Sequence, residues 1–258
     1  MKTTSWVLAA LALLCAVGIA FFASNTDEDD RLQLGLVTSL PIYWAESPSI
    51  ESMLADEQEP HWVRGKLERT YQLQPLDTLA QVSGDGTPSD ALAKLDYLLL
   101  AQPAAMPPAD LVALDSWVRG GGRALIFADP MLTEESLFGF GDKRRPQDIV
   151  TIDPLLARWG LRLAFDGDQR AGPRIVGLSD PYAAETLVDL PGTFIGLDGP
   201  DAAADCTIRF EGLVADCSVG SGKVLLVADA AILQADLTLE SDIPESALDS
   251  FLAQAFGS

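Results

Sequence analysis

WVRGGGRALIFADP, the stretch from Trp117 to Pro130, decides how the rest of the chain is interpreted. Its three glycines, Gly120 to Gly122, follow a segment with helical periodicity and precede an apolar run that is typical of a buried strand. Phosphate-binding loops have the opposite order, strand, glycines and then helix, because the N–H groups at the start of a helix must face the anion. The glycines therefore predict a left-handed helix cap and a tight connection into a strand.

Apolar runs and helical patterns alternate along the whole chain. Further apolar runs are too short for helices and are typical of buried strands, at 32–38, 97–101, 161–165 and 223–228, with a shorter strand near 71–75. Helical patterns lie around 62–69, 108–119, 153–159 and 244–256, with a further piece before Pro60. Asp153 suits an N-cap and Gly160 a helix stop. The alternation predicts an α/β fold with a mostly parallel, open sheet and helices on both faces.

The region from 167 to 219 has a different character, because it holds many of the chain's glycines and prolines and few helical periods. We interpret it as a β-rich insertion or an elaboration at the edge of the sheet. With 258 residues, of which 48% are hydrophobic, the chain can bury a substantial core. We therefore assign one α/β domain to 32–258, with the β-rich part inside it.

The N-terminal segment has the length and composition of a membrane span. From Trp6 to Ala23 it carries no charge, and as a helix it extends about 27 Å, close to the roughly 30 Å of bilayer hydrocarbon. A cleaved signal peptide is the alternative, but the run is long for one, and Phe21 or Phe22 occupies a position that should hold a small residue. We therefore favour an uncleaved membrane anchor within residues 1–24.

Charges on either side of this span predict its orientation. Lys2 precedes it, whereas four consecutive acids, Asp27 to Asp30, follow it in an acidic spacer at 25–31. This asymmetry places the amino terminus in the cytoplasm. The expected location is therefore the cytoplasmic (inner) membrane, crossed once, with the bulk of the chain in the periplasm or another extracytoplasmic space.

The charge balance restricts the partners of the protein. The chain has 17 Lys and Arg against 38 Asp and Glu, which gives a formal net charge of −21 spread along the sequence. Such a surface repels phosphate backbones and anionic lipid headgroups, so nucleic-acid binding is disfavoured. The one compact basic cluster, Lys143 to Arg145, is too short to reverse this and is interpreted as a solvated loop.

Cys206 and Cys217 lie in the stretch DCTIRFEGLVADC, which has the pattern of two short strands joined at Glu211-Gly212. A tight turn at these two residues places the cysteines directly opposite each other. In that register they form a hydrogen-bonded pair with Cα atoms about 5.5 Å apart, within the range of disulfides. An extracytoplasmic compartment permits the bond. The alternative is two separate buried thiols.

Ligands of open α/β folds bind at the edge of the sheet where the parallel strands have their carboxyl ends. The candidate site residues are therefore those that follow the expected strands, namely Ser39, Gln102, Asp129 and Asp229, with Tyr43 and Trp44 in the loop after the first strand. Two converging carboxylates can perform acid-base chemistry or hold a cation, but aspartate at a strand exit is also a common turn and helix cap. The two aromatic residues form either a binding lip or part of the core under neighbouring helices.

Residues for nucleophilic catalysis or for a metal centre are scarce. The single histidine, His61, lies in a broken helical segment and is interpreted as a surface or packing residue. No Cys or Ser occupies a strand-to-helix elbow that exposes a nucleophile. The acids show no metal-binding spacing, and two cysteines with one distant histidine are too few ligands for a zinc site. We therefore expect no cofactor and no bound metal.

Three segments of the sequence are together similar to a known family, namely LDYLLLAQP with the helix and strand that end in RALIFADP, then IDPLLARWGLRL, and finally GSGKVLLVADAAIL. They resemble the auxiliary domain of ABC transport systems related to the gliding-motility accessory proteins, over roughly 32–233. The resemblance implies a fold similar to class I glutamine amidotransferases, of flavodoxin-like type, and to their ThuA-like relatives, without the catalytic cysteine and histidine. The nucleophile position of that fold has the sequence Ala101-Gln102-Pro103 here.

These observations lead to one expected function and two alternatives. The leading expectation is a membrane-anchored, non-enzymatic accessory or binding component of an ABC-type export system, with the permease or ATPase subunits as partners. The first alternative is an extracytoplasmic hydrolase or carbohydrate-active enzyme that uses Asp129 and Asp229 as an acid-base or metal pair. The second is a structural protein of the cell envelope, which is favoured if side chains fill the crevice at the strand ends.

Overall fold

The computed structural model describes residues 31–47, 60–197, 203–234 and 242–257. The expected membrane anchor and the expected helical piece before Pro60 lie outside these ranges. Within them, no helix combines the length and the apolar character that are needed to cross a membrane.

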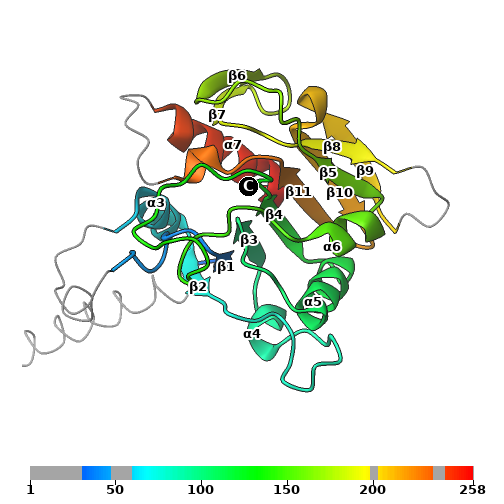
Figure 1. Ribbon diagram of the computed structural model, residues 1–258. Coiled ribbons are helices and arrows are strands. Elements are labelled where there is room, and N and C mark those ends of the chain that lie inside the picture. Colours follow the sequence, from blue (N-terminus) through cyan, green and yellow to red (C-terminus); the bar gives the residue numbers. More distant parts are fainter. Residues whose placement is uncertain (1–30, 48–59, 198–202, 235–241, 258) are drawn as a thin grey trace, which may run out of the picture.

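The core of the fold is a seven-stranded sheet in the order β2-β1-β3-β4-β11-β10-β9 (Figure 1). The strands from β2 to β11 run parallel, and β10 and β9 continue the sheet in antiparallel pairs. The expected α/β fold with a mostly parallel sheet is therefore confirmed. The strands span Gln33–Thr38 (β1), Gln72–Pro75 (β2), Tyr97–Ala101 (β3), Arg123–Phe127 (β4), Asp205–Arg209 (β9), Val214–Val219 (β10) and Gly222–Val227 (β11).

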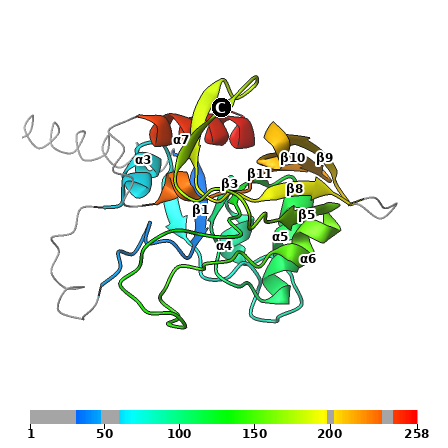
Figure 2. The same cartoon turned by 45° about the horizontal axis from the view of Figure 1, so that its top comes forward.

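Helices cover both faces of this sheet (Figures 1 and 2). Helices α3 and α7 lie on one face, joined by ion pairs from Lys66 to Glu245 and Asp249, while α4, α5 and α6 lie on the other. Phe251 of α7 packs edge-on against Phe127 of β4, so the apolar stripe of α7 closes the core. The helices span Trp62–Thr70 (α3), Asp90–Ala93 (α4), Pro108–Arg119 (α5), Asp153–Arg158 (α6) and Ile243–Phe256 (α7).

The glycines of the stretch WVRGGGRALIFADP connect α5 to β4, as expected. Gly120 is the C-cap in a right-handed conformation, and Gly121 takes a φ of 115°, which residues with a side chain disfavour. Gly122 lies against the ring of Trp117, where a Cβ has no room. The chain can therefore turn from helix to strand within these three residues, at the end of the sheet opposite the strand carboxyl ends.

The start of α6 differs by one residue from the expectation. Ile152 is the N-cap and its carbonyl accepts hydrogen bonds from Leu155 and Leu156, so Asp153 lies in the first turn. Pro154 is compatible with either register, because proline is tolerated throughout the first turn of a helix. The Asp153 carboxylate therefore adds a favourable charge at the positive end of the helix dipole instead of being the cap residue.

The β-rich region from 167 to 219 contributes to more than one sheet. Strands β6 and β7 form a two-stranded ribbon, β8 pairs with β5, and β9 and β10 belong to the central sheet. The region is therefore partly an elaboration of the sheet edge. The remaining elements span Leu161–Ala164 (β5), Arg174–Leu178 (β6), Ala184–Val188 (β7) and Thr193–Gly196 (β8), with short 3-10 helices at Phe210–Gly212 and Ala231–Leu233.

Cys206 of β9 and Cys217 of β10 lie opposite each other and form a disulfide bond, with the sulfur atoms 2.05 Å apart. The expected register is therefore confirmed. The expected Cα separation is wrong, because it is 4.1 Å, nearer the roughly 4.5 Å of a non-hydrogen-bonded pair than the 5.5 Å of a hydrogen-bonded one.

The turn between these strands explains why the pairing departs from a regular hairpin. Glu211 and Gly212 form the turn with positive φ angles, and the N–H of Leu213 donates to the carbonyl of Phe210. Phe210 also has a positive φ, of 53°. A left-handed residue at this position is absent from the ideal two-residue turn, and it distorts the strand just before the pairing begins.

We expect the disulfide to stabilise the edge of the sheet. Replacing Cys206 and Cys217 together with serine should lower the free energy of unfolding by about 2–3 kcal/mol, because the bond closes a short loop of the unfolded chain. Chemical denaturation of the oxidised protein and the double variant measures the difference, with Cys15→Ser as the control. Equal stability, or reaction of both cysteines with a thiol reagent in the exported protein, would contradict the pairing.

Candidate binding site

A cavity of about 590 Å³ lies at the carboxyl ends of β1 and β3, under the loop that follows β4. The chain passes from β1 outward to β2 and then returns across β1 to β3, so the strand order reverses between β1 and β3. In open α/β sheets, ligands bind at such a switch point. The cavity is lined by residues of the loops 38–47 and 141–148, together with Ala104 and Phe138.

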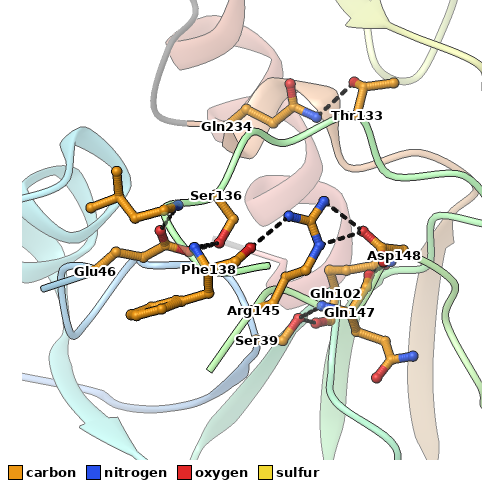
Figure 3. Close-up of polar contacts among 11 residues, drawn as sticks. Ser39, Glu46, Gln102, Thr133, Ser136, Phe138, Arg145, Gln147, Asp148 and Gln234 are labelled. Atoms are coloured by element: carbon orange, nitrogen blue, oxygen red, sulfur yellow. Dashed lines mark hydrogen bonds and ion pairs between the residues drawn. The ribbon is translucent and has the colours of Figure 1, made fainter. Parts of the chain in front are cut away.

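Gln102, the residue after β3, joins the strand ends next to this cavity. Figure 3 shows Gln102 beside Ser39 and Gln147. Its side chain is fully buried, and its backbone takes a φ of 46°, which is uncommon for a residue with a side chain. The amide oxygen accepts from the N–H of Asp129 at 2.8 Å. The amide nitrogen donates to the carbonyl of Asp129 at 3.0 Å and to the carbonyl of Gln147 at 2.8 Å. One side chain therefore ties β3 to the end of β4 and to the loop that walls the cavity.

Ser39, in the loop after β1, completes this network and lines the cavity. Its hydroxyl donates to the Gln102 carbonyl at 2.6 Å and accepts from the N–H of Gln147 at 2.9 Å. Its own N–H donates to the same Gln102 carbonyl at 3.1 Å. The structure thus brings three of the predicted site residues together, Ser39, Gln102 and Asp129, as connections between strand ends.

The outer wall of the cavity is braced by a second set of polar contacts (Figure 3). The Glu46 carboxylate accepts from the hydroxyl of Ser136 and from the following backbone N–H, both at 2.6 Å. Arg145 donates to the carbonyl of Phe138 at 3.1 Å and forms an ion pair with Asp148 at 3.1 Å. The Glu46 contacts hold the loop after β1 against the loop after β4, and the Arg145 contacts brace the loop after β4 internally.

The two aromatic residues of the first loop have different surroundings. Tyr43 is half-buried, with the guanidinium of Arg64 4.3 Å from its ring centre and a hydrogen bond of 3.0 Å from Arg64 to its carbonyl. Trp44 is 73% exposed and lines the cavity, with its ring edge-on to Tyr43. Trp44 therefore forms an aromatic lip, whereas Tyr43 packs toward α3.

Asp129 closes the base of the long loop after β4. Its side chain is fully buried, and its carboxylate accepts from the N–H of Met131 at 2.8 Å and of Ala230 at 3.0 Å. Its backbone carbonyl accepts from the N–H of Val150, at the far end of the loop, at 3.0 Å. Asp129 is therefore a turn cap that joins both ends of the loop, and it does not line the cavity.

Asp229, after β11, has similar surroundings and is 2% exposed. Its carboxylate accepts from the N–H of Ala231 at 2.7 Å and of Asp189 at 3.0 Å. Burial raises the pKa of Asp129 to about 7, against the opposing effect of its backbone donors. Burial and the neighbouring charge of Asp129 raise the pKa of Asp229 well above its ordinary value. The two carboxyl groups are thus coupled electrostatically, and each oxygen has a backbone partner.

The basic cluster is closer to the site than the sequence suggested. Lys143, Arg144 and Arg145 line the cavity, so their interpretation as a solvated loop is incomplete. Arg144 stacks on Phe138 at 4.0 Å and pairs with Asp142 at 2.7 Å. The sequence signal that could have identified them is the occurrence of three consecutive bases in an otherwise acidic chain, between the expected strand that ends at Phe127 and the next helix. Of the predicted site residues, Ser39 and Trp44 line the cavity, whereas Tyr43, Gln102, Asp129 and Asp229 do not.

His61 begins α3 and does not line the cavity. Its Nδ1 accepts from the N–H of Val63 at 3.2 Å, and its Nε2 is buried without a partner among the described residues. Burial lowers the pKa of His61 to about 4, so the ring is neutral at ordinary pH. In the part of the chain that the structure describes, no group of His, Cys, Asp and Glu side chains has the arrangement of a metal site.

The raised pKa values predict a stability that falls as the pH rises. Because burial raises the pKa of Asp129 to about 7, folding takes up a proton at this group between about pH 4 and pH 7. The raised pKa of Asp229 acts in the same direction. The free energy of unfolding should therefore be roughly 2–3 kcal/mol lower at pH 8 than at pH 5. Urea denaturation across this range measures the slope.

Asparagine variants test the assignment of this slope. Asp129→Asn and Asp229→Asn should each reduce the slope, although both will also lose stability because an amide N–H then faces a backbone N–H. Asp142→Asn is the control, because the hydrogen bond from Arg144 lowers the pKa of Asp142 to about 2, outside the range. A stability that is constant or rises from pH 5 to pH 8 would contradict the assignment.

Comparison with solved structures shows a shared fold. The mmIFT52 N-terminal domain has a TM-score of 0.52 at 12% identity, and 87% of this chain and 97% of that domain are covered. The exo-beta-1,4-mannosidase Op5Man5 from Opitutaceae bacterium strain TAV5 has a TM-score of 0.49 at 15% identity, with 88% of this chain but 36% of the mannosidase covered. A putative ThuA-like protein from Bacteroides uniformis has a TM-score of 0.45 at 8% identity, with 87% and 91% covered. At 12% identity, the likeness to the mmIFT52 domain concerns the fold alone, and the two lower scores add no further argument.

The family of the chain follows from its sequence. No curated protein matches it. The family model described as an ABC-type uncharacterized transport system matches residues 31–166, which is more than half of the 258 residues. The matched part contains β1 to β5 and all residues that line the cavity. The chain therefore belongs to this family of auxiliary components of ABC-type transport systems.

Proposed function

We propose that this protein is a membrane-anchored, non-enzymatic accessory component that binds a ligand or a partner subunit for an ABC-type export system. Family membership supplies the auxiliary role in ABC-type transport. The observation that carries the binding role is the open cavity of about 590 Å³ at the switch point of the sheet. In a purely structural envelope protein, side chains would fill this crevice, so the cavity favours binding over that alternative.

The residue at the nucleophile position supports a role without chemistry of its own. Gln102 has the left-handed backbone of a sharp turn after a strand, but its amide is committed to three hydrogen bonds inside the protein. An amide is a poor nucleophile, and the hydroxyl of Ser39 donates its proton to a backbone carbonyl instead of to a base. The position is therefore suited to shaping the cavity.

One observation favours the alternative of a hydrolase. The pKa of Asp129, raised to about 7, is in the range of general acids. However, the carboxyl groups of Asp129 and Asp229 are buried, and their four oxygens already accept from backbone N–H groups. A general acid must lie within hydrogen-bond reach of the atom that it protonates. The binding role therefore has the stronger support.

The proposed location is the inner membrane, with the folded domain on its extracytoplasmic side. The apolar segment 6–23 supplies the anchor, and the acids that follow it favour this orientation. The disulfide between β9 and β10 supports the same side, because such bonds persist in oxidising compartments. A domain held there would meet the extracytoplasmic surface of a permease.

Purification from membranes with crosslinked neighbours tests the proposal. We expect the permease or ATPase subunits of an ABC-type system among the crosslinked proteins. Recovery should fall strongly in Ala104→Trp, because the indole fills the cavity from an exposed position in its lining. Ala93→Trp, at an exposed position on α4, is the matched control. Complete absence of transport subunits would contradict the accessory role. Equal recovery with both variants would contradict the role of the cavity in binding.

A further inference from the structure

Large apolar side chains are exposed around the cavity. Trp44 is 73% exposed, Leu137 68% and Phe140 87%. Glu46 holds the Trp44 loop beside Leu137, because its carboxylate accepts the N–H of Leu137 at 2.6 Å. Phe140 lies against the guanidinium of Arg145, which is 4.6 Å from its ring centre. Exposed aromatic rings next to arginine are typical of the anchor residues of protein–protein interfaces.

We call Trp44, Leu137, Phe140, Lys143 and Arg144 the docking rim. Hydrogen bonds hold the loops that carry these residues in place. The loop that carries most of these residues is tied at both ends to Asp129 and in its middle to the loop after β1. The wall behind it is held through Gln147 by Gln102 and Ser39. A surface that is already ordered loses little conformational entropy when a partner binds.

Around the cavity, the charges balance in an otherwise acidic chain. The lining contains three bases against three acids, namely Lys143, Arg144 and Arg145 against Glu46, Asp142 and Asp148. The whole chain has 17 bases against 38 acids. An acidic partner is therefore repelled less at this cavity than the net charge of the whole chain implies.

The polar groups of the docking rim that still lack a partner are mainly hydrogen-bond donors. The carboxylates of Glu46, Asp142 and Asp148 accept from neighbouring loop residues. Lys143 is exposed and forms no ion pair with a described residue. The side chain of Arg144 is 62% exposed, and it uses two of its three nitrogens on Asp142. Free N–H groups of Lys143 and Arg144 are therefore available to carboxylates of a partner.

We propose that the docking rim binds an acidic polypeptide segment of a partner protein. A large apolar residue of the segment inserts into the cavity against Trp44, and flanking carboxylates pair with Lys143 and Arg144. The inference rests on the proposed function, since it names the kind of partner that the cavity takes.

A polypeptide fits this surface better than a lipid membrane does. A peptide places a few carboxylates beside Lys143 and Arg144, whereas an anionic membrane surface extends beyond the cavity and faces the net charge of −21 of the whole chain. A cavity of about 590 Å³ also receives a single inserted side chain, whereas a bilayer presents a broad interface.

Binding of defined peptides tests the proposal on the full chain in detergent. The probe has a central tryptophan flanked by glutamates, and the comparison peptides carry lysine flanks or a central alanine. In NMR titrations, the acidic tryptophan peptide should shift the indole N–H signal of Trp44 and bind at least about tenfold more tightly than either comparison peptide. Added salt should weaken this binding, because ion pairs contribute to it.

Variants of the rim give the matched comparison. Trp44→Ala and the double variant Lys143→Glu, Arg144→Glu should each weaken binding at least about tenfold. Ile175→Ala and Lys94→Glu remove an exposed apolar side chain and an exposed base on β6 and after α4, and should leave binding unchanged. All of these positions are exposed, so thermal melting should show that the variants fold.

Three results would overturn the inference. The first is equal binding of the acidic and basic peptides, and the second is binding that survives Trp44→Ala. The third is sedimentation with vesicles of phosphatidylcholine and phosphatidylglycerol that depends on Trp44 while the peptides do not bind. If transport subunits are recovered from membranes but the acidic peptide does not bind, the docking of an acidic segment is contradicted and the accessory role is not. Absence of those subunits with intact peptide binding would instead sink the accessory role.

Discussion

The buried amide of Gln102 is the interaction on which the candidate site depends. A side chain in a dry interior must satisfy its donors and acceptors, and that of Gln102 does so with the backbone of Asp129 and Gln147. Its backbone carbonyl also accepts the two hydrogen bonds that Ser39 donates, from its hydroxyl and from its N–H. The ends of β1, β3 and β4 and the cavity wall are thus joined through one residue. The unfavourable φ of Gln102 is tolerated because these contacts determine its position.

The carboxylates behind this network have a related structural role. Asp129 and Asp229 sit where a catalytic pair is expected from the topology, yet each is enclosed by backbone N–H groups. Burial and mutual repulsion disfavour two charges here, whereas the N–H groups favour them. The result is a pair of caps whose protonation is linked to the stability of the fold. Such linkage follows from burial alone and requires no reaction.

Much of the framework was predictable from the sequence, because it depends on local periodicity and turn chemistry. The order helix, glycines, strand predicted a left-handed residue among the three glycines after α5, which the structure places at Gly121. The turn at Glu211-Gly212 placed Cys206 opposite Cys217. Rules that use only neighbouring residues also gave two small errors, in the start of a helix and in the Cα separation of the disulfide pair. The predicted start of α6 was wrong by one residue. The left-handed backbone of Phe210 changed the Cα separation of the disulfide pair but left its register as predicted.

The cavity itself was only partly predictable. Topology identified the edge of the sheet at which the cavity lies, and Ser39 and Trp44 line the cavity there. The role of the basic residues depends on the path of an irregular loop, which no periodicity describes. That path is set by contacts between residues far apart in sequence, such as Glu46 with Ser136. The sequence therefore supplied an edge and a composition, whereas the balance of charge around the cavity required the folded structure.

Amide hydrogen exchange of a Gln102→Leu variant tests the central claim most directly. Leucine has a similar size, so the substitution removes the amide hydrogen bonds while it keeps most of the packing. The account predicts that exchange accelerates in 131–150 and around Ser39, while the amides in the middle of β3, β4 and β11 stay protected. Gln169→Leu, which removes a hydrogen bond to the carbonyl of Pro191, should leave the loop unchanged. Unchanged exchange in 131–150 after loss of the Gln102 amide would contradict the account.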